Sequence, residues 1–192
     1  MAMKTETVGK KVERPFRERR LYCTKDGQWV TLRPARESDA AEITKRMARV
    51  VKEGVYLEED PDTMPSGVEN QKEIRDIQKD GGMYTVAEVN GKIAGVAILK
   101  RGSMEMSRHT AKFRTWLAPG FRGMGLGKKL MEYTIAWAKA HGLEKINLDV
   151  FSNNQRAIKL YKKYGFRKEG HLHKQYVLKG EYVDEIYMSL FI

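Results

Sequence analysis

A glycine-rich stretch at residues 121–130, FRGMGLGKKL, constrains the fold more than any other part of the chain. It lies between a predicted strand and a predicted helix, and its glycines stand at alternate positions: Gly123, Gly125 and Gly127. Glycine costs about 1 kcal/mol against alanine inside a helix, so three of them at a helix start need a reason. The first amides of a helix lack partners within it, and the helix dipole is positive at that end. With Arg122 and Lys128 beside it, the stretch predicts a site for a phosphate-like anion held against the backbone.

Two common phosphate-binding motifs do not fit this stretch. The Walker motif needs a Ser or Thr after its Gly-Lys pair, but Lys129 follows Gly127-Lys128 here. The dinucleotide motif G-x-G-x-x-G has a different spacing, because these glycines follow the pattern G-x-G-x-G. The pattern therefore indicates an anion site of another kind.

The rest of the chain predicts an α+β fold with a mixed sheet. Asn90-Gly91 between two β-rich runs is a strong hairpin signal, and Asp26-Gly27 is another. Ser66 is expected to cap one helix and either Ser38 or Asp39 another, with Glu42 at capping-box spacing from Asp39. The expected strands cover 83–89, 92–100, 109–117 and 145–151, with hairpins over 21–35 and 166–190, and the expected helices cover 39–52, 66–81, 125–141 and 154–164.

The first twenty residues differ from the remainder. Residues 1–20 are rich in Lys and Arg and lack hydrophobic periodicity, which predicts a basic flexible arm, and residues 21–192 are expected to form a single domain. The sequence holds no apolar run of about 18 residues and no signal-peptide pattern. Cys23 is the single cysteine, so an internal disulfide is excluded. We therefore expect a cytoplasmic protein without membrane contact.

Four stretches, in order, resemble the GNAT family of N-acetyltransferases. Arg122-x-x-Gly125-x-Gly127 resembles the family's acyl-CoA motif, and LDVFSNNQRAIKLYKKYGF at 148–166 resembles a second family stretch. VTLRPARESDAAEI resembles the opening strand and helix. KGEYVDEIYMSL resembles the closing hairpin of bacterial members of the phosphinothricin and L-amino-acid N-acetyltransferase type. The resemblance covers residues 30–192. It implies a mixed, mostly antiparallel sheet flanked by helices, here with an extra N-terminal hairpin.

The resemblance implies acetyl-CoA as co-substrate, with its diphosphate on the backbone of the glycine turn, residues 121–127. The pantetheine arm would run beside the preceding strand and pair with it as an added strand does. The residues expected to bind the cofactor are Thr115, Trp116, Leu117, Arg122, Gly123, Met124, Gly125, Leu126, Gly127, Lys128 and Asn154. Asn154 is also a residue type that commonly caps helices.

Acetyl transfer to an amine requires a base that takes the amine proton and an acid that protonates the leaving thiolate. The resemblance places Tyr161 as the acid, on the same helix as Asn154. Many family members carry an acidic residue on the strand before the glycine turn, whereas this chain has Lys112 and Arg114 there. The base stays open between Asp149, Glu58 or Glu59, and a chain of water molecules.

The acidic segment, residues 53–69, holds six acidic residues and no Lys or Arg, in a chain whose net charge is +11. It is either a solvated loop or, as the resemblance implies, a border of the acceptor site. In the second case Glu58 and Glu59 would bind the acceptor, and the negative charge would favour cationic amines.

The favoured function is acetyl-CoA-dependent N-acetyl transfer to a primary amine of a small molecule, by direct attack in a ternary complex. A peptide or protein acetyltransferase, acting on N-termini or lysines, is the alternative enzyme. A non-catalytic CoA-binding or nucleic-acid-binding protein is the alternative of another class. Nucleic acid is disfavoured because no basic-aromatic recognition motif occurs. A homodimer stays open.

No metal is expected to bind. His171 and His173 share one face of a predicted strand, which is a ligand-like arrangement, but the sequence shows no third ligand beside them.

Overall fold

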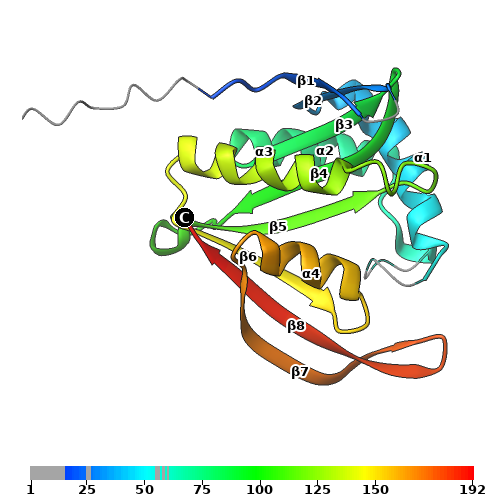
Figure 1. Cartoon of the computed structure of the whole chain (residues 1–192), viewed down its shortest axis with the longest axis vertical. Coiled ribbons are helices and arrows are strands. Elements are labelled where there is room, and N and C mark those ends of the chain that lie inside the picture. The colour runs from blue at the N-terminus through cyan, green and yellow to red at the C-terminus, as the bar shows by residue number, and fades with distance from the viewer. Residues whose placement is uncertain (1–15, 25–26, 55–56, 58, 60) are drawn as a thin grey trace, which may run out of the picture.

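The computed structural model describes residues 16–24, 27–54, 57, 59 and 61–192. Its centre is an eight-stranded sheet in the order β1-β2-β3-β4-β5-β6-β8-β7 (Figure 1). The strands are β1 Arg20–Cys23, β2 Trp29–Pro34, β3 Met83–Val89, β4 Lys92–Arg101, β5 Thr110–Leu117, β6 Lys145–Phe151, β7 Arg167–Leu178 and β8 Glu181–Phe191. Neighbouring strands are antiparallel, except that β5 and β6 are parallel. The expected α+β class with a mixed, mostly antiparallel sheet is confirmed.

Helices cover both faces of the sheet. On one face, α1 (Ala40–Val51) and α2 (Gly67–Lys79) pack through a hydrophobic cluster that includes Ile98 of β4. On the other face, α3 (Leu126–Ala140) and α4 (Gln155–Lys163) pack through a cluster that includes Leu99. Successive β4 residues thus serve opposite cores, as strand geometry requires. No helix in the described ranges is long and apolar enough to span a bilayer. Short 3-10 helices cover Glu37–Asp39, Pro61–Thr63 and Glu105–Ser107.

The two hairpins that the sequence predicts around Asp26-Gly27 and Asn90-Gly91 are present. β3 and β4 meet at Asn90-Gly91, whose φ angles are 49° and 76°. A type I′ turn needs positive φ at both central residues, and Asn followed by Gly satisfies this at low cost. β1 and β2 form the extra N-terminal hairpin, with Gly27 at φ 80° and Asp26 outside the described residues.

Both helices begin as predicted, but only the cap of α2 forms as expected. Ser66 caps α2, because its Oγ accepts from the amide of Glu69 at 3.3 Å and the Glu69 carboxylate accepts from the amide of Ser66 at 2.7 Å. The capping box expected from Asp39 into α1 is not formed. The Asp39 carboxylate instead accepts from the amide of Arg36 and from the guanidinium of Arg33, each at 2.7 Å. A charged donor on β2 thereby takes the carboxylate that would have capped the helix.

The first described residues pack on α3. Phe16 lies edge-on to Tyr133 with ring centroids 5.1 Å apart, and the Tyr133 hydroxyl donates to the carbonyl of Glu18 at 2.6 Å. Packing on the domain therefore already includes Phe16, before the predicted boundary at residue 21. Residues 1–15 of the predicted arm lie outside the described residues.

The parallel strands β5 and β6 pair over a short distance and then separate. Thr110–Lys112 lie beside Lys145–Asn147, and no pairing follows although β5 continues to Leu117 and β6 to Phe151. The sheet therefore opens between them, and α3 begins at the wide end of this opening (Figure 1). The opening connects the two faces of the sheet and positions the candidate site.

Candidate active site

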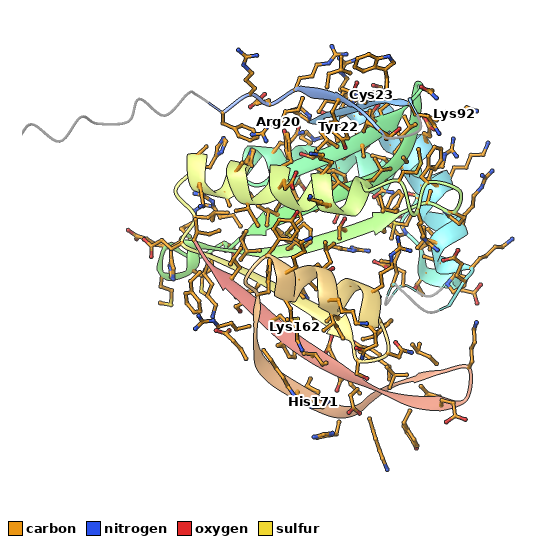
Figure 2. All side chains as sticks on the ribbon, in the orientation of Figure 1. Arg20, Tyr22, Cys23, Lys92, Lys162 and His171 are labelled. Atoms are coloured by element: carbon orange, nitrogen blue, oxygen red, sulfur yellow. The ribbon has the colours of Figure 1, made fainter. Side chains whose placement is uncertain are left out.

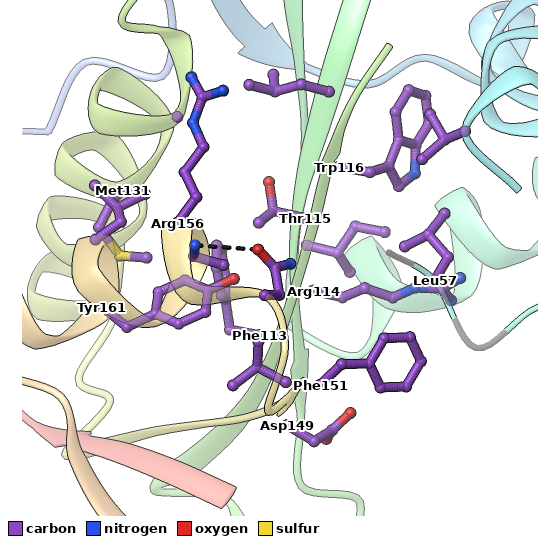
Figure 3. A pocket seen from close by; sticks show the side chains of 18 of the residues that line it. Leu57, Phe113, Arg114, Thr115, Trp116, Met131, Asp149, Phe151, Arg156 and Tyr161 are labelled. Carbon is purple, nitrogen blue, oxygen red and sulfur yellow. Dashed lines mark hydrogen bonds between the residues drawn. The ribbon is translucent and has the colours of Figure 1, made fainter. Parts of the chain in front are cut away.

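A cleft of about 920 Å³ occupies the opening between β5 and β6 (Figure 3). Its glycine side consists of the glycine turn and the first turns of α3 and α4. Its charged side consists of Glu59, Glu73, Lys112, Arg114 and Asp149. Predicted site residues that line the cleft are Thr115, Trp116, Leu117, Arg122, Gly123, Gly125, Leu126, Gly127, Lys128, Asp149, Asn154, Tyr161 and Glu59. Met124 is not among the lining residues, and Glu58 lies outside the described ones.

The three glycines of the glycine turn serve different purposes. Gly123 and Gly125 have φ angles of 89° and 82°, a conformation that other residues rarely adopt. Gly127 has no such constraint, and a Cβ there would meet Leu160 at 3.6 Å, an ordinary contact. The protein alone therefore requires glycine at 123 and 125 for the backbone. At Gly127 the missing side chain leaves room in the cleft.

The first turns of α3 and α4 both direct positive charge at the cleft. Neither first turn contains an acidic residue, although acidic residues are favoured there. Lys128 and Arg156 occupy these turns instead, and both line the cleft. Gly125, the residue before α3, has no side chain to cap the helix, so the first amides of α3 are available to a ligand. Two positive helix ends with added cations suit a polyanion such as a diphosphate. Arg156 was missed in the sequence, where its one signal is a cation in a first helical turn.

Arg122 holds the glycine turn in place. Its Nε donates to the carbonyl of Leu117 at 3.0 Å, and its guanidinium pairs with Glu53 at 2.8 Å. The side chain thus ties the end of β5 to the segment after α1. A direct contact with the cofactor remains a prediction for this residue.

α4 carries the predicted acid and one predicted cofactor contact. Asn154 caps the helix, with its Oδ1 accepting from the amide of Ala157 at 3.2 Å. The Tyr161 ring lies edge-on to Phe113 with centroids 6.3 Å apart, and its hydroxyl points into the opening beside β5 (Figure 3). Burial, supported by the charge of Asp149, raises the pKa of Tyr161 well above its usual value. The phenol therefore keeps its proton across the ordinary pH range.

The charged side pairs each cation of β5 with a carboxylate from another element. Lys112 Nζ lies 2.6 Å from a carboxylate oxygen of Asp149, near the end of β6. Arg114 forms an ion pair with Glu59 of the acidic segment. The two cations that depart from the family pattern are therefore each matched by one of the carboxylates considered as a base.

The acidic segment is more than a solvated loop. Glu53 pairs with Arg122, Glu59 pairs with Arg114, and Glu69 completes the cap of α2. Three of its carboxylates thus have structural partners, which leaves less negative charge to attract a ligand than the sequence indicates.

A further carboxylate on the charged side was missed in the sequence. Glu73, from the middle of α2, lines the cleft close to Lys100. Burial raises the pKa of Glu73, and the positive charge of Lys100 opposes this rise. Within the described part of the chain, Glu73 forms no hydrogen bond or ion pair. In the sequence, Glu73 falls on the polar face of an amphipathic helix, where a solvent-exposed side chain is expected. Its place in the cleft follows only from the way α2 packs.

Sequence comparison identifies the family to which the chain belongs and several relatives. Residues 51–166 match the model of the Acetyltransferase (GNAT) family. The L-amino acid N-acetyltransferase AaaT of Escherichia coli K12 is 30% identical over 130 residues, which cover 66% of this chain and 78% of that protein. The spermidine N(1)-acetyltransferase of the same strain is 29% identical over 107 residues, which cover 55% of this chain and 56% of that protein. The chain thus spans little more than half of this second relative.

Solved structures agree with the fold. An acetyltransferase of the GNAT family from Streptococcus pneumoniae has a TM-score of 0.79 and 28% identity, with 85% of this chain and 99% of that chain covered. A phosphinothricin acetyltransferase from Sinorhizobium meliloti, solved in complex with AcCoA, has a TM-score of 0.78 and 25% identity, with 85% and 88% covered. The fold expected from the four sequence stretches is confirmed.

Proposed function

This chain belongs to the acetyltransferase (GNAT) family, and from that premise we propose that it transfers the acetyl group of acetyl-CoA to a primary amine of a small molecule. The amine would attack the thioester directly while both substrates are bound. The observation that carries the proposal is the opening between β5 and β6, which ends at the uncapped start of α3. It offers a free strand edge for the pantetheine amides and helix amides for the diphosphate.

The glycine side fits the cofactor. Among the described residues, β5 has no strand partner on its β6 side beyond Lys112, so the backbone of Thr115 and of Leu117 faces the opening, where the Leu117 carbonyl already accepts from Arg122. The diphosphate would lie on the first amides of α3, between Lys128 and Arg156. Acetyl-CoA in the structure of the S. meliloti relative supports this choice of co-substrate.

In the proposed reaction Tyr161, which lines the cleft, protonates the thiolate of CoA as it leaves. A thiol has a pKa near 8.5 and a phenol near 10, so the unperturbed proton transfer is only modestly uphill. Burial makes the Tyr161 phenol a weaker acid than that, which keeps it protonated and ready to donate. Its hydroxyl adds a hydrogen bond to the sulfur as negative charge develops there.

The amine reaches the thioester from the charged side, where two carboxylates are candidates to take its proton. Asp149 lies at the opening but is tied to Lys112. Glu73 has no such partner in the described chain, and its raised pKa brings it closer to that of an effective base at neutral pH. Either carboxylate would act through water where the amine lies beyond direct reach.

The pairing of charges also bears on the acceptor. Lys112 with Asp149 and Arg114 with Glu59 give the charged side both signs in close proximity. This favours a small amine that also carries a negative group, such as an amino acid, over a polyamine. The preference for cationic acceptors expected from the acidic segment is correspondingly weakened.

The function is tested with a panel of acceptors. Acetyl-CoA and the purified protein are combined with amino acids, polyamines, aminoglycosides and peptides, and released CoA is measured as free thiol. Turnover of an amino acid supports the proposal, and turnover of peptides alone would identify the alternative enzyme. Stabilisation by acetyl-CoA without turnover of any amine would point to a CoA-binding protein, and a salt-dependent DNA shift to a nucleic-acid-binding one.

A further inference from the structure

A cluster of two imidazoles and a carboxylate lies on the long β7–β8 hairpin, where Figure 2 labels one of its members, His171, and none of the three residues lines the cleft. His171 and His173 come from β7, and Asp184 from β8. One ligand atom from each of the three residues lies within 4.8 Å of the other two. His171 Nε2 and His173 Nδ1 lie 2.8 Å and 3.2 Å from the same carboxylate oxygen, Oδ2 of Asp184. The sequence HLH at 171–173 offers only two ligands, and Asp184 on the neighbouring strand β8 supplies a third.

A bulge in β7 builds this cluster. Leu172 pairs with Glu185 and Tyr176 with Val183, so β7 holds extra residues at this point. Lys174, within the bulge, has a φ angle of 52°, which is uncommon for a residue other than glycine. Its amide donates to Oδ1 of Asp184 at 2.8 Å. One carboxylate oxygen is thus fixed by the backbone, and the other is held facing the two rings.

We propose that His171, His173 and Asp184 bind a divalent transition-metal ion such as Zn²⁺, Co²⁺ or Ni²⁺. Two imidazole nitrogens and one carboxylate oxygen are a ligand set that these ions accept. The ring centroids of the two histidines lie 4.3 Å apart, so both can turn toward one point near Oδ2. His173 is exposed, which leaves positions for water to complete the coordination. The bound ion would join β7 to β8 where their hydrogen-bond ladder is interrupted.

Lys168 competes with the metal in this arrangement. Its ammonium lies 2.8 Å from Nδ1 of His171, and an ammonium can only donate, so this nitrogen accepts. The proton of neutral His171 is then on Nε2, the atom that faces Asp184. Metal binding at Nε2 moves that proton to Nδ1 and breaks the hydrogen bond from Lys168. Removal of Lys168 should therefore strengthen metal binding, because it frees Nδ1 of His171 to take the proton and removes a positive charge beside the ion.

The bulge also connects to the cleft. Tyr176, the first paired residue after the bulge, packs edge-on to Phe151 with ring centroids 5.1 Å apart. Phe151 lines the cleft. A metal that fixes the bulge would thereby also fix one wall of the cleft, although the proposal does not depend on the enzymatic function.

The test uses the full-length protein, treated with a chelator and titrated with Co²⁺ and Zn²⁺. Co²⁺ absorption in the visible range and calorimetry with Zn²⁺ should both report one site. His173→Gln, at an exposed position that preserves the fold, should weaken binding by about tenfold or more, and His171→Gln likewise. Lys168→Met should tighten binding several-fold. His109→Gln, outside the cluster, is the matched control and should leave affinity unchanged.

Three results would overturn the proposal. The first is the absence of any saturable binding of Co²⁺ or Zn²⁺. The second is binding that survives His171→Gln and His173→Gln, which would place the ion elsewhere. The third is an affinity unchanged or lowered in Lys168→Met while the melting temperature of the metal-free variant stays at the wild-type value, which would contradict coordination through Nε2 of His171. With either of the first two results, the cluster is a hydrogen-bonded brace for the bulge.

Discussion

On the glycine side of the cleft, backbone amides and two helix starts face the open space, with cations added to the first turns of both helices. On the charged side, the groups that face the same space are side chains from α2, β5, β6 and the acidic segment. The glycine side is thus built within one strand–turn–helix unit and the start of α4. The charged side is assembled from segments far apart in the chain, as in the pair of Arg114 with Glu59.

The difference shows how each side tolerates change. Backbone amides keep their chemistry when side chains that line the cleft change, so the glycine side suits a constant ligand that is recognised through conformation. Paired side chains can be exchanged singly, so the charged side is where related chains can acquire different acceptors. We therefore expect substitutions on the glycine side to affect all acceptors equally, and substitutions on the charged side to depend on the acceptor.

The largest effect is expected from Gly127→Asp. A Cβ at this position fits the protein without strain, and a negative charge in the first turn of α3 favours the helix. The same charge would repel a diphosphate. Acetyl-CoA at a hundred times its Kd should stabilise the wild type by about 2.7 kcal/mol. This stabilisation should disappear in the variant, whose unliganded melting temperature stays the same or rises.

Gly127→Asn is the matched control, because it has the same shape without the charge. It should lose less affinity than Gly127→Asp. If acetyl-CoA raises the melting temperature of Gly127→Asp as much as that of the wild type, the diphosphate does not bind at the start of α3. The proposed difference between the glycine side and the charged side would then be wrong.

Tyr161→Phe tests the hydroxyl alone, because the ring and its contact with Phe113 remain. We expect kcat to fall by about 10² or more for every acceptor, while acetyl-CoA affinity is retained. Since the phenol is protonated throughout, the alkaline limb of the kcat/KM profile should not move. A wild-type kcat in single-turnover measurements would exclude Tyr161 as the acid.

Glu73→Gln should lower the reaction rate and raise the stability of the fold at neutral pH, so the two effects can be measured separately. Burial raises the pKa of Glu73, so the folded protein holds this proton to higher pH than the unfolded chain does, and the ionised carboxylate destabilises the fold. Below the usual Glu pKa of about 4.3, wild type and variant should unfold alike, whereas at neutral pH the variant should be more stable. If Glu73 takes the amine proton, kcat falls by about tenfold or more in this more stable protein. Denaturation curves and pH–rate profiles measure both effects.

Asp149→Asn is the counterpart of Glu73→Gln on the same side of the cleft. Loss of the ion pair with Lys112 should not stabilise the protein at neutral pH. If Asp149 relays the amine proton, the rate should fall most at low pH, where more of the amine is protonated. A rate deficit that does not vary with pH would leave Asp149 as the partner of Lys112 and assign the base to Glu73 or water.

The smallest effect is expected from Glu53→Gln, which releases one partner of Arg122 while its bond to Leu117 remains. If the charge of Arg122 assists the diphosphate, acetyl-CoA affinity should rise by about two- to fivefold, the gain of a modest electrostatic contact. A fall in affinity would show that Arg122 acts by holding the turn. Calorimetric titration with CoA distinguishes the two.

The sequence predicted the fold and the glycine side because local rules determine them. Asn90-Gly91 specifies its hairpin through φ angles, and Gly123 and Gly125 specify the turn before α3 in the same way. The charged side was predicted only in part. Asp149 and Glu59 were named, but their partners on β5 were read as a departure from the family pattern. Glu73 was missed because helical periodicity does not reveal which exposed position another element covers. The same limit explains Asp39, whose carboxylate is taken by Arg33 of β2 instead of capping α1.

The short contact between β5 and β6 has a consequence for hydrogen exchange and for association with other chains. Beyond Lys112, β5 carries an edge in the middle of the sheet that no strand of the described chain pairs with, between the helices that cover the two faces. The amides on this edge should exchange rapidly with solvent in the free protein and slowly once a ligand pairs with them. Exposed edges attract extended chains, but the layers on either side admit only a narrow one. An extended peptide should therefore compete with acetyl-CoA for the same edge, and occupation of the cleft protects the sheet from pairing with a foreign strand.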